Sequence, residues 1–406
     1  MTRMAALSGI TVLDLTHMLA GPYGAMLLAD LGAQTIKVEP PQRGEGTREL
    51  LRDDPLYARD GMGAYFLTLN RNKRSVAIDL KSEAGRLVFL DLVRRADVVF
   101  DNFAAGVTTR LGIDHAALAA VNPRIVTCSV TGFGATGPGA DRPAFDQVVQ
   151  AMGGGMSITG EPGGPPMRSG IPIGDLGGGL FGALGILAAL QERSTSGRGR
   201  HVDISMLDVQ VSLLNYMATM HLMSGVVPQA AGNGHFVHVP YNTYRTADGW
   251  IVIACLGDAF FERLLDVLQH PGLRDPAFRR QPARYAARDR IDAIVGEELA
   301  GDGTAHWLER LGAARVPCGP VNDFAQALDD PQVRARGMVV EVPLKSGECV
   351  RMPGNPIKFA DAEGPAGPDA YASPPGLGEH TDAVLGELLG YAPPQIAALR
   401  RDGAIA

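Results

Sequence analysis

Largely apolar runs that alternate with helical segments are the feature of this chain that most restricts its fold. Runs such as "ITVLDLT" and "DVVFDNF" have the composition of parallel strands that are covered on both faces. The segment "KSEAGRLVFLDLVRRAD" predicts a helix whose apolar residues form one face: Phe89, Leu92, Val93 and Ala96. Ser82 is suited to cap that helix. Strands that alternate with helices predict an open, parallel, Rossmann-like α/β sheet.

The character of the sequence changes near residue 226. Beyond it, two strand-like runs meet at "ADG", as in a hairpin, and helical segments follow. The tail "GLGEHTDAVLGELLGYAPPQIAALRR" is helical again. We therefore expect a large α/β domain in residues 1–225, a smaller α+β domain in residues 226–325, and a C-terminal segment, residues 326–406, that returns to the large domain.

Composition excludes several classes of function. The chain has 406 residues, of which 46% are hydrophobic and 20% charged, as in folded soluble proteins. Its net charge is −7 and its Lys and Arg residues are scattered, so neither nucleic acid nor a membrane is an expected partner. Four widely spaced cysteines and the lack of a signal-peptide pattern favour a reducing, cytoplasmic compartment without disulfides or bound metal. The longest uncharged apolar run, Leu176–Leu190, is too short to span a bilayer.

Asp175 is the one charged residue in the glycine-rich stretch "IPIGDLGGGLFGALGILAAL". Aspartate at the start of a helix is a common N-cap, which gives Asp175 a structural explanation. The three glycines after it indicate a second one, because they let a ligand or another backbone approach closely. Amides at a helix N-terminus stabilise negative charge, so we expect the Asp175 carboxylate to stay ionised and to be available as a nucleophile.

Other catalytic motifs are weak or missing. "GFGATG", Gly132–Gly137, matches the dinucleotide-binding fingerprint, but no helix opens directly after it, so we interpret it as a turn. The nine histidines form no zinc motif, and on a strand His235 and His238 would point to opposite faces. No nucleophile-elbow sequence indicates a hydrolase.

Two further segments could contact a ligand. "NRNKRS", Asn70–Ser75, is a compact basic segment before a strand, and it is either a solvated turn or a phosphate contact. "DNF" follows a strand at the edge where open α/β sheets bind ligands. There Asn102 supplies an amide and Phe103 a ring on which a ligand can stack.

The chain resembles the family III CoA-transferases. The resemblance rests on these segments, which occur in the family's order: "LDLTHMLAGPYGAMLLADLGAQTIKVEPP", "NRNKRSVAIDL", "DNFAAGVTTRLG", "GIPIGDLGGGLFGALGILAAL", "VPCGPVND" and "GLGEHTD". The resemblance implies that Asp175 attacks an acyl-CoA thioester and passes through an aspartyl anhydride and an aspartyl-CoA thioester. It implies no cofactor beyond the CoA substrate and no metal.

The resemblance also implies the other site residues. Those at the CoA site would be His17, Met18, Ala20, Lys73, Arg74, Asn102, Phe103 and Arg110. The family's glycine-rich loop over the site corresponds to "GNGH", which contains Gly232, Gly234 and His235. Pro40 and Thr131 stand where formyl-CoA transferases carry basic residues, so Arg43 or Arg74 would bind phosphate instead.

An α-methylacyl-CoA racemase is the alternative function within the family. The proton-transfer histidine of the racemases corresponds to Phe145 in "AFD", and phenylalanine carries no transferable proton. We therefore expect a transferase. A CoA-binding protein without catalytic activity is the third hypothesis.

Two arginines indicate a class of acceptor. Arg48 and Arg168 are expected in loops that face the site, where each could bind the second carboxylate of a dicarboxylic acid. Alternatively, they hold CoA phosphates or carboxylates of the protein itself. We expect succinyl-CoA as donor and a C4–C5 dicarboxylate as acceptor. Because family members form interlocked dimers, the resemblance also implies a homodimer.

Overall fold

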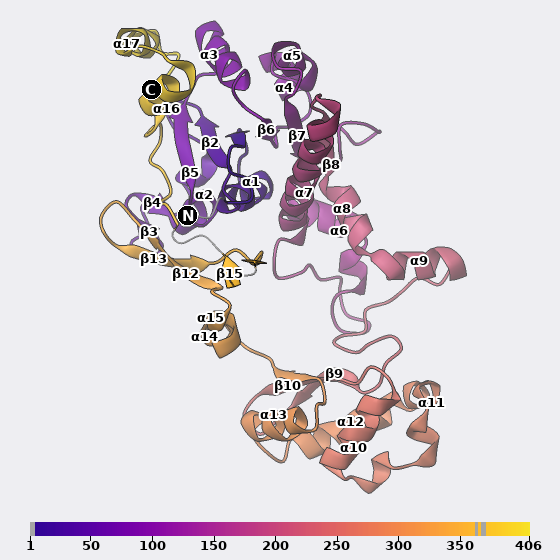
Figure 1. The fold of residues 1–406 in the computed structure, drawn as a ribbon. Helices are drawn as coiled ribbons and strands as arrows, with labels where there is room; N and C mark the ends of the chain where they lie inside the picture. The colour runs from indigo at the N-terminus through magenta and orange to yellow at the C-terminus, as the bar shows by residue number, and fades with distance from the viewer. Residues whose placement is uncertain (1–4, 362–363, 367–370) are drawn as a thin grey trace. The chain divides into compact units, whose positions relative to one another are not determined.

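The computed structural model describes residues 5–361, 364–366 and 371–406 (Figure 1). The chain divides into two compact units. The first consists of Met1–Met156, Arg168–Val226 and Ala335–Ala406, and the second consists of Ser157–Met167 and Val227–Arg334. Relative to the expected boundaries at 226 and 325, the second unit extends to Arg334 and takes in the stretch 157–167.

A six-stranded sheet forms the centre of the first unit. Its strands lie in the order β5-β2-β1-β6-β7-β8 and every neighbouring pair is parallel, which confirms the predicted sheet. The strands are β1 (Thr11–Asp14), β2 (Gln34–Glu39), β5 (Lys73–Ala77), β6 (Val98–Asp101), β7 (Val126–Thr131) and β8 (His201–Ser205). The chain winds outward from β1 to β5 and then adds β6 on the other side of β1. The carboxyl ends of β1 and β6 therefore form a topological switch point, where such sheets bind ligands.

Helices cover both faces of the sheet. One face packs against α3 (Glu83–Val93), α5 (His115–Val121), α16 (Thr381–Leu389) and α17 (Pro393–Arg401), and the other against α1 (Ala20–Asp30) and α7 (Ile173–Ser196). Consecutive residues of β1 point to opposite faces of the sheet. Leu13 packs in the core that contains α3, α5, α16 and α17, and Val12 packs in the core that contains α1 and α7. The predicted apolar face of α3 is buried, and the Ser82 hydroxyl accepts a hydrogen bond from Gly85 N (3.0 Å), as the sequence predicted.

The close packing of α1 against α7 depends on glycine. A Cβ atom on Gly179 of α7 would lie 2.3 Å from the carbonyl oxygen of Ala20, and one on Gly24 of α1 would lie 2.5 Å from the carbonyl oxygen of Gly179. Both obstacles are backbone atoms, which cannot move aside as a flexible side chain can. The expectation that the glycine run admits a second backbone is therefore confirmed.

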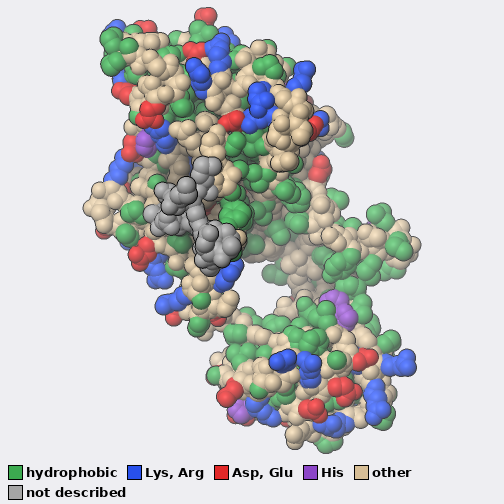
Figure 2. All heavy atoms as spheres, in the orientation of Figure 1, with side chains coloured by type: hydrophobic (Ala, Val, Ile, Leu, Met, Phe, Trp, Pro, Cys, Tyr) green, Lys and Arg blue, Asp and Glu red, His purple; other side chains and the backbone are tan. Residues whose placement is uncertain are grey.

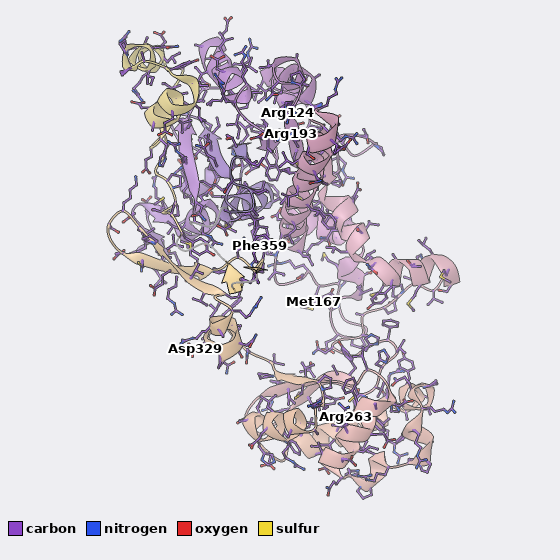
Figure 3. The ribbon with its side chains drawn as sticks, viewed as in Figure 1. Arg124, Met167, Arg193, Arg263, Asp329 and Phe359 are labelled. Atoms are coloured by element: carbon purple, nitrogen blue, oxygen red, sulfur yellow. The ribbon has the colours of Figure 1, made fainter. Side chains whose placement is uncertain are left out.

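α7 is longer than the apolar run from which it was predicted. It spans 24 residues and is, by length and composition alone, long and apolar enough to cross a membrane, so the helix is not too short to span a bilayer as expected from the run Leu176–Leu190. Its packing is nevertheless that of a core helix, since Gly182 lies against the side chains of Phe100 and Val130. At its carboxyl end, Arg193 donates hydrogen bonds to the Asp97 carboxylate (2.8 Å) and to the carbonyl oxygen of Arg124 (3.1 Å) (Figure 3).

Several short elements of the first unit were not predicted. They are β3 (Ala58–Arg59), β4 (Met62–Gly63), α2 (Ala64–Asn70), the hairpin β12 (Val339–Pro343) and β13 (Cys349–Pro353), and the pair β14 (Phe359–Asp361) and β15 (Gly364–Ala366). Phe66 and Leu67 of α2 share a small core with Val342 and Met352 of the hairpin. Helix α2 and the β12–β13 hairpin are short and far apart in the chain, so neither of the two shows a periodic pattern in the sequence.

Two successive helices follow β8. α8 (Met206–Leu213) and α9 (Asn215–Ser224) follow one another, and Asn215 has a φ angle of 47°. Asparagine tolerates this left-handed conformation better than most residues do, so it allows the break.

The second unit contains a three-stranded antiparallel sheet in the order β11-β10-β9. β9 (Tyr241–Arg245) and β10 (Trp250–Ala254) form the hairpin expected at "ADG". The other elements are α10 (Asp258–Leu268), α11 (Gln281–Ala286), α12 (Arg288–Leu299), α13 (Thr304–Ala313), β11 (Cys318–Pro320) and α14 (Phe324–Asp329). The short helix α15 (Pro331–Ala335) ends at the boundary with the first unit. The stretch 157–167 joins this unit through a hydrogen bond from Gly232 N to Gly160 O (3.0 Å).

We expect Gly179→Ala to lower the free energy of unfolding by about 1–3 kcal/mol, the usual cost of overpacking. The new methyl group would collide with the Ala20 carbonyl oxygen, so α1 and α7 would have to separate. Urea denaturation of the full chain measures the effect. Gly386→Ala in α16 is the matched control, because a Cβ there meets nothing nearer than 4.0 Å. Equal stability of the two variants would contradict the proposed role of the glycine contact.

Candidate active site

The switch point between β1 and β6 brings together several residues that the sequence assigned to CoA. Asn102 accepts a hydrogen bond from His17 N (2.7 Å) and donates one to His17 O (2.8 Å), which ties together the segments that follow β1 and β6. The rings of His17 and Phe103 lie 5.2 Å apart. Met18 is partly exposed with a φ angle of 62°, and α1 begins two residues later at Ala20. Burial lowers the pKa of His17, which favours a neutral imidazole at this edge.

Asp175 lies in the first turn of α7, but it does not cap the helix. The N-cap position belongs to Pro172, so the N-cap explanation for Asp175 is wrong. The cap comes from Asp146, the first residue of α6 (Asp146–Met152). Its Oδ1 accepts hydrogen bonds from Gly174 N (2.8 Å) and from Asp175 N (3.3 Å). The half-buried side chain of Asp175 is therefore not used to cap α7.

The protonation of Asp175 follows from this arrangement. Burial and the neighbouring Asp146 carboxylate raise the pKa of Asp175 to about 6. Helix amides do not stabilise the Asp175 carboxylate as expected, because Asp146 occupies those amides and adds a like charge that favours the protonated form of Asp175. Tyr65 of α2 lies within electrostatic range, since burial and then Asp175 raise the pKa of its phenol. Near pH 7 the Asp175 carboxylate is mostly ionised and is more basic than an ordinary aspartate.

The contact between α1 and α7 connects Asp175 with the switch point. α1 begins at Ala20, two residues after Met18, and a Cβ on Gly178 of α7 would lie 3.8 Å from the Ala20 Cβ. Asp175 precedes Gly179 by about one helical turn, or about 5.4 Å along the axis. The candidate nucleophile and the residues that follow β1 therefore belong to one region of the first unit.

Lys73 is buried, and its charge is paired within the protein. Its Nζ donates to Asp14 Oδ2 (2.8 Å) and to the carbonyl oxygen of Pro22 (3.2 Å), and neither charged side chain is exposed. Burial by itself would raise the pKa of Asp14, but Lys73 and Lys37 outweigh it and lower that pKa to about 2. The solvated turn considered for Asn70–Ser75 is wrong, because Asn70, Arg71, Lys73 and Ser75 are all buried.

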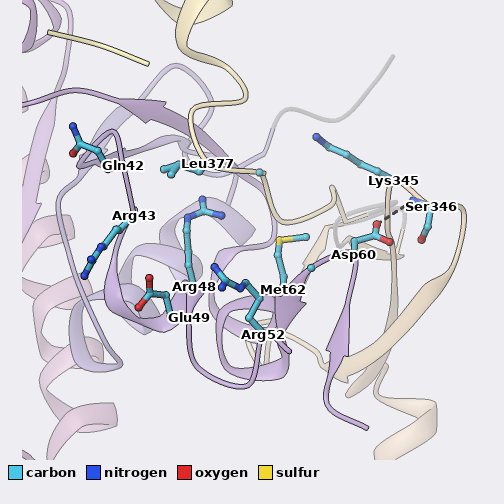
Figure 4. Close-up of a pocket in the computed structure, with 12 residues that line it drawn as sticks. Gln42, Arg43, Arg48, Glu49, Arg52, Asp60, Met62, Lys345, Ser346 and Leu377 are labelled. Carbon is cyan, nitrogen blue, oxygen red and sulfur yellow. Dashed lines mark hydrogen bonds between the residues drawn. The ribbon is translucent and has the colours of Figure 1, made fainter. Parts of the chain in front are cut away.

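Arg48 is also paired inside the first unit. Its Nε and Nη2 each donate to one oxygen of Glu39 at 2.7 Å, and its guanidinium stacks over the Phe66 ring. This pairing favours the alternative that Arg48 binds a carboxylate of the protein. Arg48 and the exposed Arg43 line a pocket of about 590 Å³ (Figure 4). Of the two, Arg43 is the one placed to meet a ligand from solvent.

The other basic residues assigned to ligands lie nearer the surface. Arg74 donates to the Glu387 carboxylate (2.7 Å). Arg110, in α4 (Val107–Leu111), is exposed and lines a pocket of about 380 Å³ together with Lys81 and Arg86. Arg168 is exposed, and its Nη1 donates to the carbonyl oxygen of Ser169 (3.2 Å). Arg110 and Arg168 are therefore accessible to a negatively charged ligand.

The residues of the "GNGH" loop belong to the second unit, whereas Asp175 belongs to the first. Gly232 has a φ angle of 60°, which suits glycine, and Gly234 follows it in the same turn. His235 and His238 lie in a loop before β9 and not on a strand, so the strand geometry that would separate them does not apply. His235 Nδ1 accepts a hydrogen bond from His238 N (3.1 Å), and the two ring centroids lie 4.7 Å apart. Within the described part of the chain, no group of three or more His, Cys, Asp or Glu residues could hold a metal ion.

Sequence reasoning missed Asp146 and Tyr65 as members of the site. The segment "AFD" drew attention only to Phe145, whose side chain is 71% exposed. Nothing in the local sequence shows that α7 takes its cap from another helix. Tyr65 lies in α2, which was not predicted, so no sequence signal could have assigned it.

We expect Lys73→Met to lower the free energy of unfolding by about 3–5 kcal/mol, because it leaves the Asp14 carboxylate buried without its partner. Urea denaturation measures the loss, and Lys81→Met, at an exposed lysine of the same unit, is the control. Wild-type stability of Lys73→Met combined with weaker CoA binding would instead show that Lys73 contacts the ligand.

Known proteins match this chain along almost its whole length. The family model described as CoA-transferase family III matches residues 7–381. An acetyl-CoA:oxalate CoA-transferase of Acetobacter aceti is 42% identical over 359 residues, which cover 88% of this chain and 90% of that protein. A succinate–glutarate CoA-transferase of Agrobacterium fabrum is 38% identical over 95% of this chain and 96% of its own length.

A solved structure agrees with the sequence matches. The crystal structure of a CaiB/BaiF family protein from Brucella suis has a TM-score of 0.83 and 37% identity to this chain, and the match covers 95% of this chain and 100% of that one. The parallel sheet, the order of the motifs and these matches lead to one conclusion. The chain belongs to CoA-transferase family III.

Proposed function

We propose that the chain transfers CoA from an acyl-CoA donor to a carboxylic acid and that Asp175 is the nucleophile. The observation that carries this proposal is the environment of Asp175, a half-buried carboxylate in the first turn of α7 whose pKa is raised to about 6. At neutral pH such a group is charged, yet it is more nucleophilic than an ordinary aspartate.

The transfer takes four steps. The Asp175 carboxylate attacks the carbonyl carbon of the donor thioester, and the C–S bond breaks to give a mixed anhydride and CoA thiolate. The thiolate attacks the aspartyl carbonyl, which releases the donor acid and forms an aspartyl-CoA thioester. The acceptor carboxylate attacks that thioester, which gives a second anhydride and free thiolate. Attack of the thiolate on the acceptor's acyl carbonyl then yields the new acyl-CoA and restores the Asp175 carboxylate.

The switch point supplies the proposed CoA site. His17 and Phe103 offer ring surfaces there, and Asn102 fixes the backbone between them through its two hydrogen bonds with His17. Arg43 and Arg110 are the exposed arginines that we assign to CoA phosphates. Because water hydrolyses anhydrides, the bound substrates must shield the half-buried Asp175 side chain from solvent.

For the substrates we propose succinyl-CoA as donor and a C4–C5 dicarboxylate as acceptor. The relatives named above act, by their names, on oxalate and on succinate and glutarate, which are all dicarboxylic acids. Arg168 is exposed seven residues before the nucleophile and can bind the second carboxylate of such an acid. We also propose a cytoplasmic location, since the four unpaired cysteines suit a reducing compartment.

Asp175→Asn should abolish CoA transfer while the fold and the affinity for CoA stay close to those of the wild type, because the amide cannot attack a thioester. Initial rates with succinyl-CoA and glutarate measure the effect. Asp208→Asn is the matched control, because Asp208 is an exposed aspartate in the first turn of α8. Near-native turnover by Asp175→Asn would end the proposed mechanism.

Arg168→Ala should raise the KM for a dicarboxylate acceptor, by an amount equal to about 2–4 kcal/mol of binding energy if the bound acid buries the ion pair. The KM for succinyl-CoA should change little. Arg95→Ala, at an exposed arginine after α3, is the control. If monocarboxylic acids outperform every dicarboxylate in an acceptor screen, the proposed substrate class is wrong.

We further propose that the enzyme is a homodimer. The exposed apolar side chains of α8 and α9 form a patch made of Val211, Leu213, Tyr216, Met220, Leu222 and Met223. Leu222 and Met223 are each 82% exposed, and hydrophobic side chains gather over α9 in Figure 2. Soluble proteins seldom leave such a patch uncovered. A second copy of the chain, as the resemblance implies, would cover it.

Sedimentation velocity at micromolar concentration should therefore show a dimer. Leu222→Glu combined with Met223→Glu should shift the chain toward the monomer, because both residues lie in the exposed patch. Leu87→Glu on α3, at a leucine that is 53% exposed, should leave the dimer intact. A wild-type monomer would contradict the proposed assembly.

A further inference from the structure

Asp146 holds the backbone of the nucleophile as well as the end of its helix. Its Oδ1 accepts hydrogen bonds from Gly174 N (2.8 Å) and from Asp175 N (3.3 Å), and no side chain of the N-cap residue itself serves this turn. Only 9% of Asp146 is exposed. The approach requires a glycine, since a Cβ on Gly174 would lie 2.7 Å from Val149 Cγ2 and 3.0 Å from Asp146 Oδ1. The starts of α6 and α7 are thus arranged to bring this carboxylate against the Asp175 backbone.

The second oxygen of Asp146 is fixed too. Gln150, one turn later in α6, donates from Nε2 to Asp146 Oδ2 (2.7 Å). The Oε1 of Gln150 accepts a hydrogen bond from Ser169 N (2.9 Å), and only 3% of Gln150 is exposed. The Asp146 carboxylate cannot rotate without breaking one of these bonds. Its orientation relative to Asp175 is therefore set by the chain on both sides.

The charge of Asp146 acts on Asp175 at short range. Burial and this charge both favour the protonated form of Asp175 and raise its pKa. The other titratable groups around the site come from separate segments: Tyr65 from α2 and Glu45 from the loop after β2. The phenol of Tyr65 interacts electrostatically with Asp175, Glu45 and Asp146, so all four groups belong to one electrostatic environment.

We propose that Asp146 is the positioning residue of the nucleophile: its hydrogen bonds orient the Asp175 backbone, and its negative charge sets the pH range in which Asp175 reacts. The proposal rests on Asp175 being the nucleophile. Asp146 itself touches no reacting atom and exchanges no proton in the reaction. A carboxylate that only capped α7 would affect stability and leave the pH dependence of turnover unchanged.

The pH dependence of kcat/KM for succinyl-CoA tests the proposal, because it reports the ionisation of the free enzyme. In the wild type it should rise with pH and be half-maximal near pH 6, because protonation below that pKa removes the nucleophile. Asp146→Asn keeps an acceptor oxygen for Gly174 N and Asp175 N but removes the charge. Its inflection should move to lower pH by about one unit. Asp146→Ala also loses both hydrogen bonds, so its kcat should fall about 10–100-fold with little change in the KM for the donor.

A double variant separates the charge from the hydrogen bonds. In Asp146→Asn alone, the new amide NH2 group would face the Nε2 donor of Gln150, and two donors cannot form a hydrogen bond. Adding Gln150→Glu supplies acceptors for that amide and for Ser169 N, and it moves the negative charge one side chain further from Asp175. The double variant should regain wild-type thermal stability while its pH profile stays shifted. Asp208→Asn in α8 is the control and should keep the wild-type profile.

Wild-type pH profiles in both Asp146→Asn and the double variant would overturn the proposal. If neither variant folds, Gln150→Leu decides: it frees one oxygen of Asp146 and should lower kcat about tenfold at unchanged KM, whereas an unchanged kcat would overturn the proposal. The two hypotheses fail in different ways. Turnover by Asp175→Asn rejects the proposed function, whereas an essential Asp175 with an unmoved pH profile rejects only the role of Asp146.

Discussion

The backbone contact between α1 and α7 at Gly24 and Gly179 is the constraint on which the candidate active site depends. α1 begins directly after the switch point at β1, and α7 carries Asp175 one turn before the contact. Larger residues at the two glycines would separate the helices and move the nucleophile away from His17 and Met18. The glycine-rich sequence after Asp175 is therefore explained by a second backbone packed against it.

Buried ion pairs fix the segments around this site. Lys73 pairs with Asp14 at the end of β1, and Arg48 pairs with Glu39 at the end of β2. Such pairs add little net stability, because desolvation offsets their attraction, but removing one partner leaves an uncompensated buried charge. Their effect is to hold the segments after the strands in one arrangement. Basic residues that resemble ligand contacts in the sequence thus serve the scaffold on which the site is built.

Local patterns made part of the fold predictable. The strands, the buried face of α3 and its Ser82 cap follow from residues that are close in sequence. Asp175 could be singled out because it stands alone in an apolar run and because the surrounding motifs resemble a known family. The cap from Asp146 and the pairing of Lys73 could not be predicted, since both depend on contacts between distant segments. Short elements such as α2 escaped prediction because a few residues show no period.

The proposed mechanism requires a covalent intermediate on Asp175, and this intermediate can be trapped chemically. The wild-type chain would be incubated with succinyl-CoA without an acceptor, treated with hydroxylamine, and mapped by peptide mass spectrometry. Hydroxylamine attacks both the anhydride and the aspartyl-CoA thioester, so we expect a hydroxamate at Asp175 and none in Asp175→Asn. Active enzyme that yields no adduct at Asp175, or one at another carboxylate, would contradict the account.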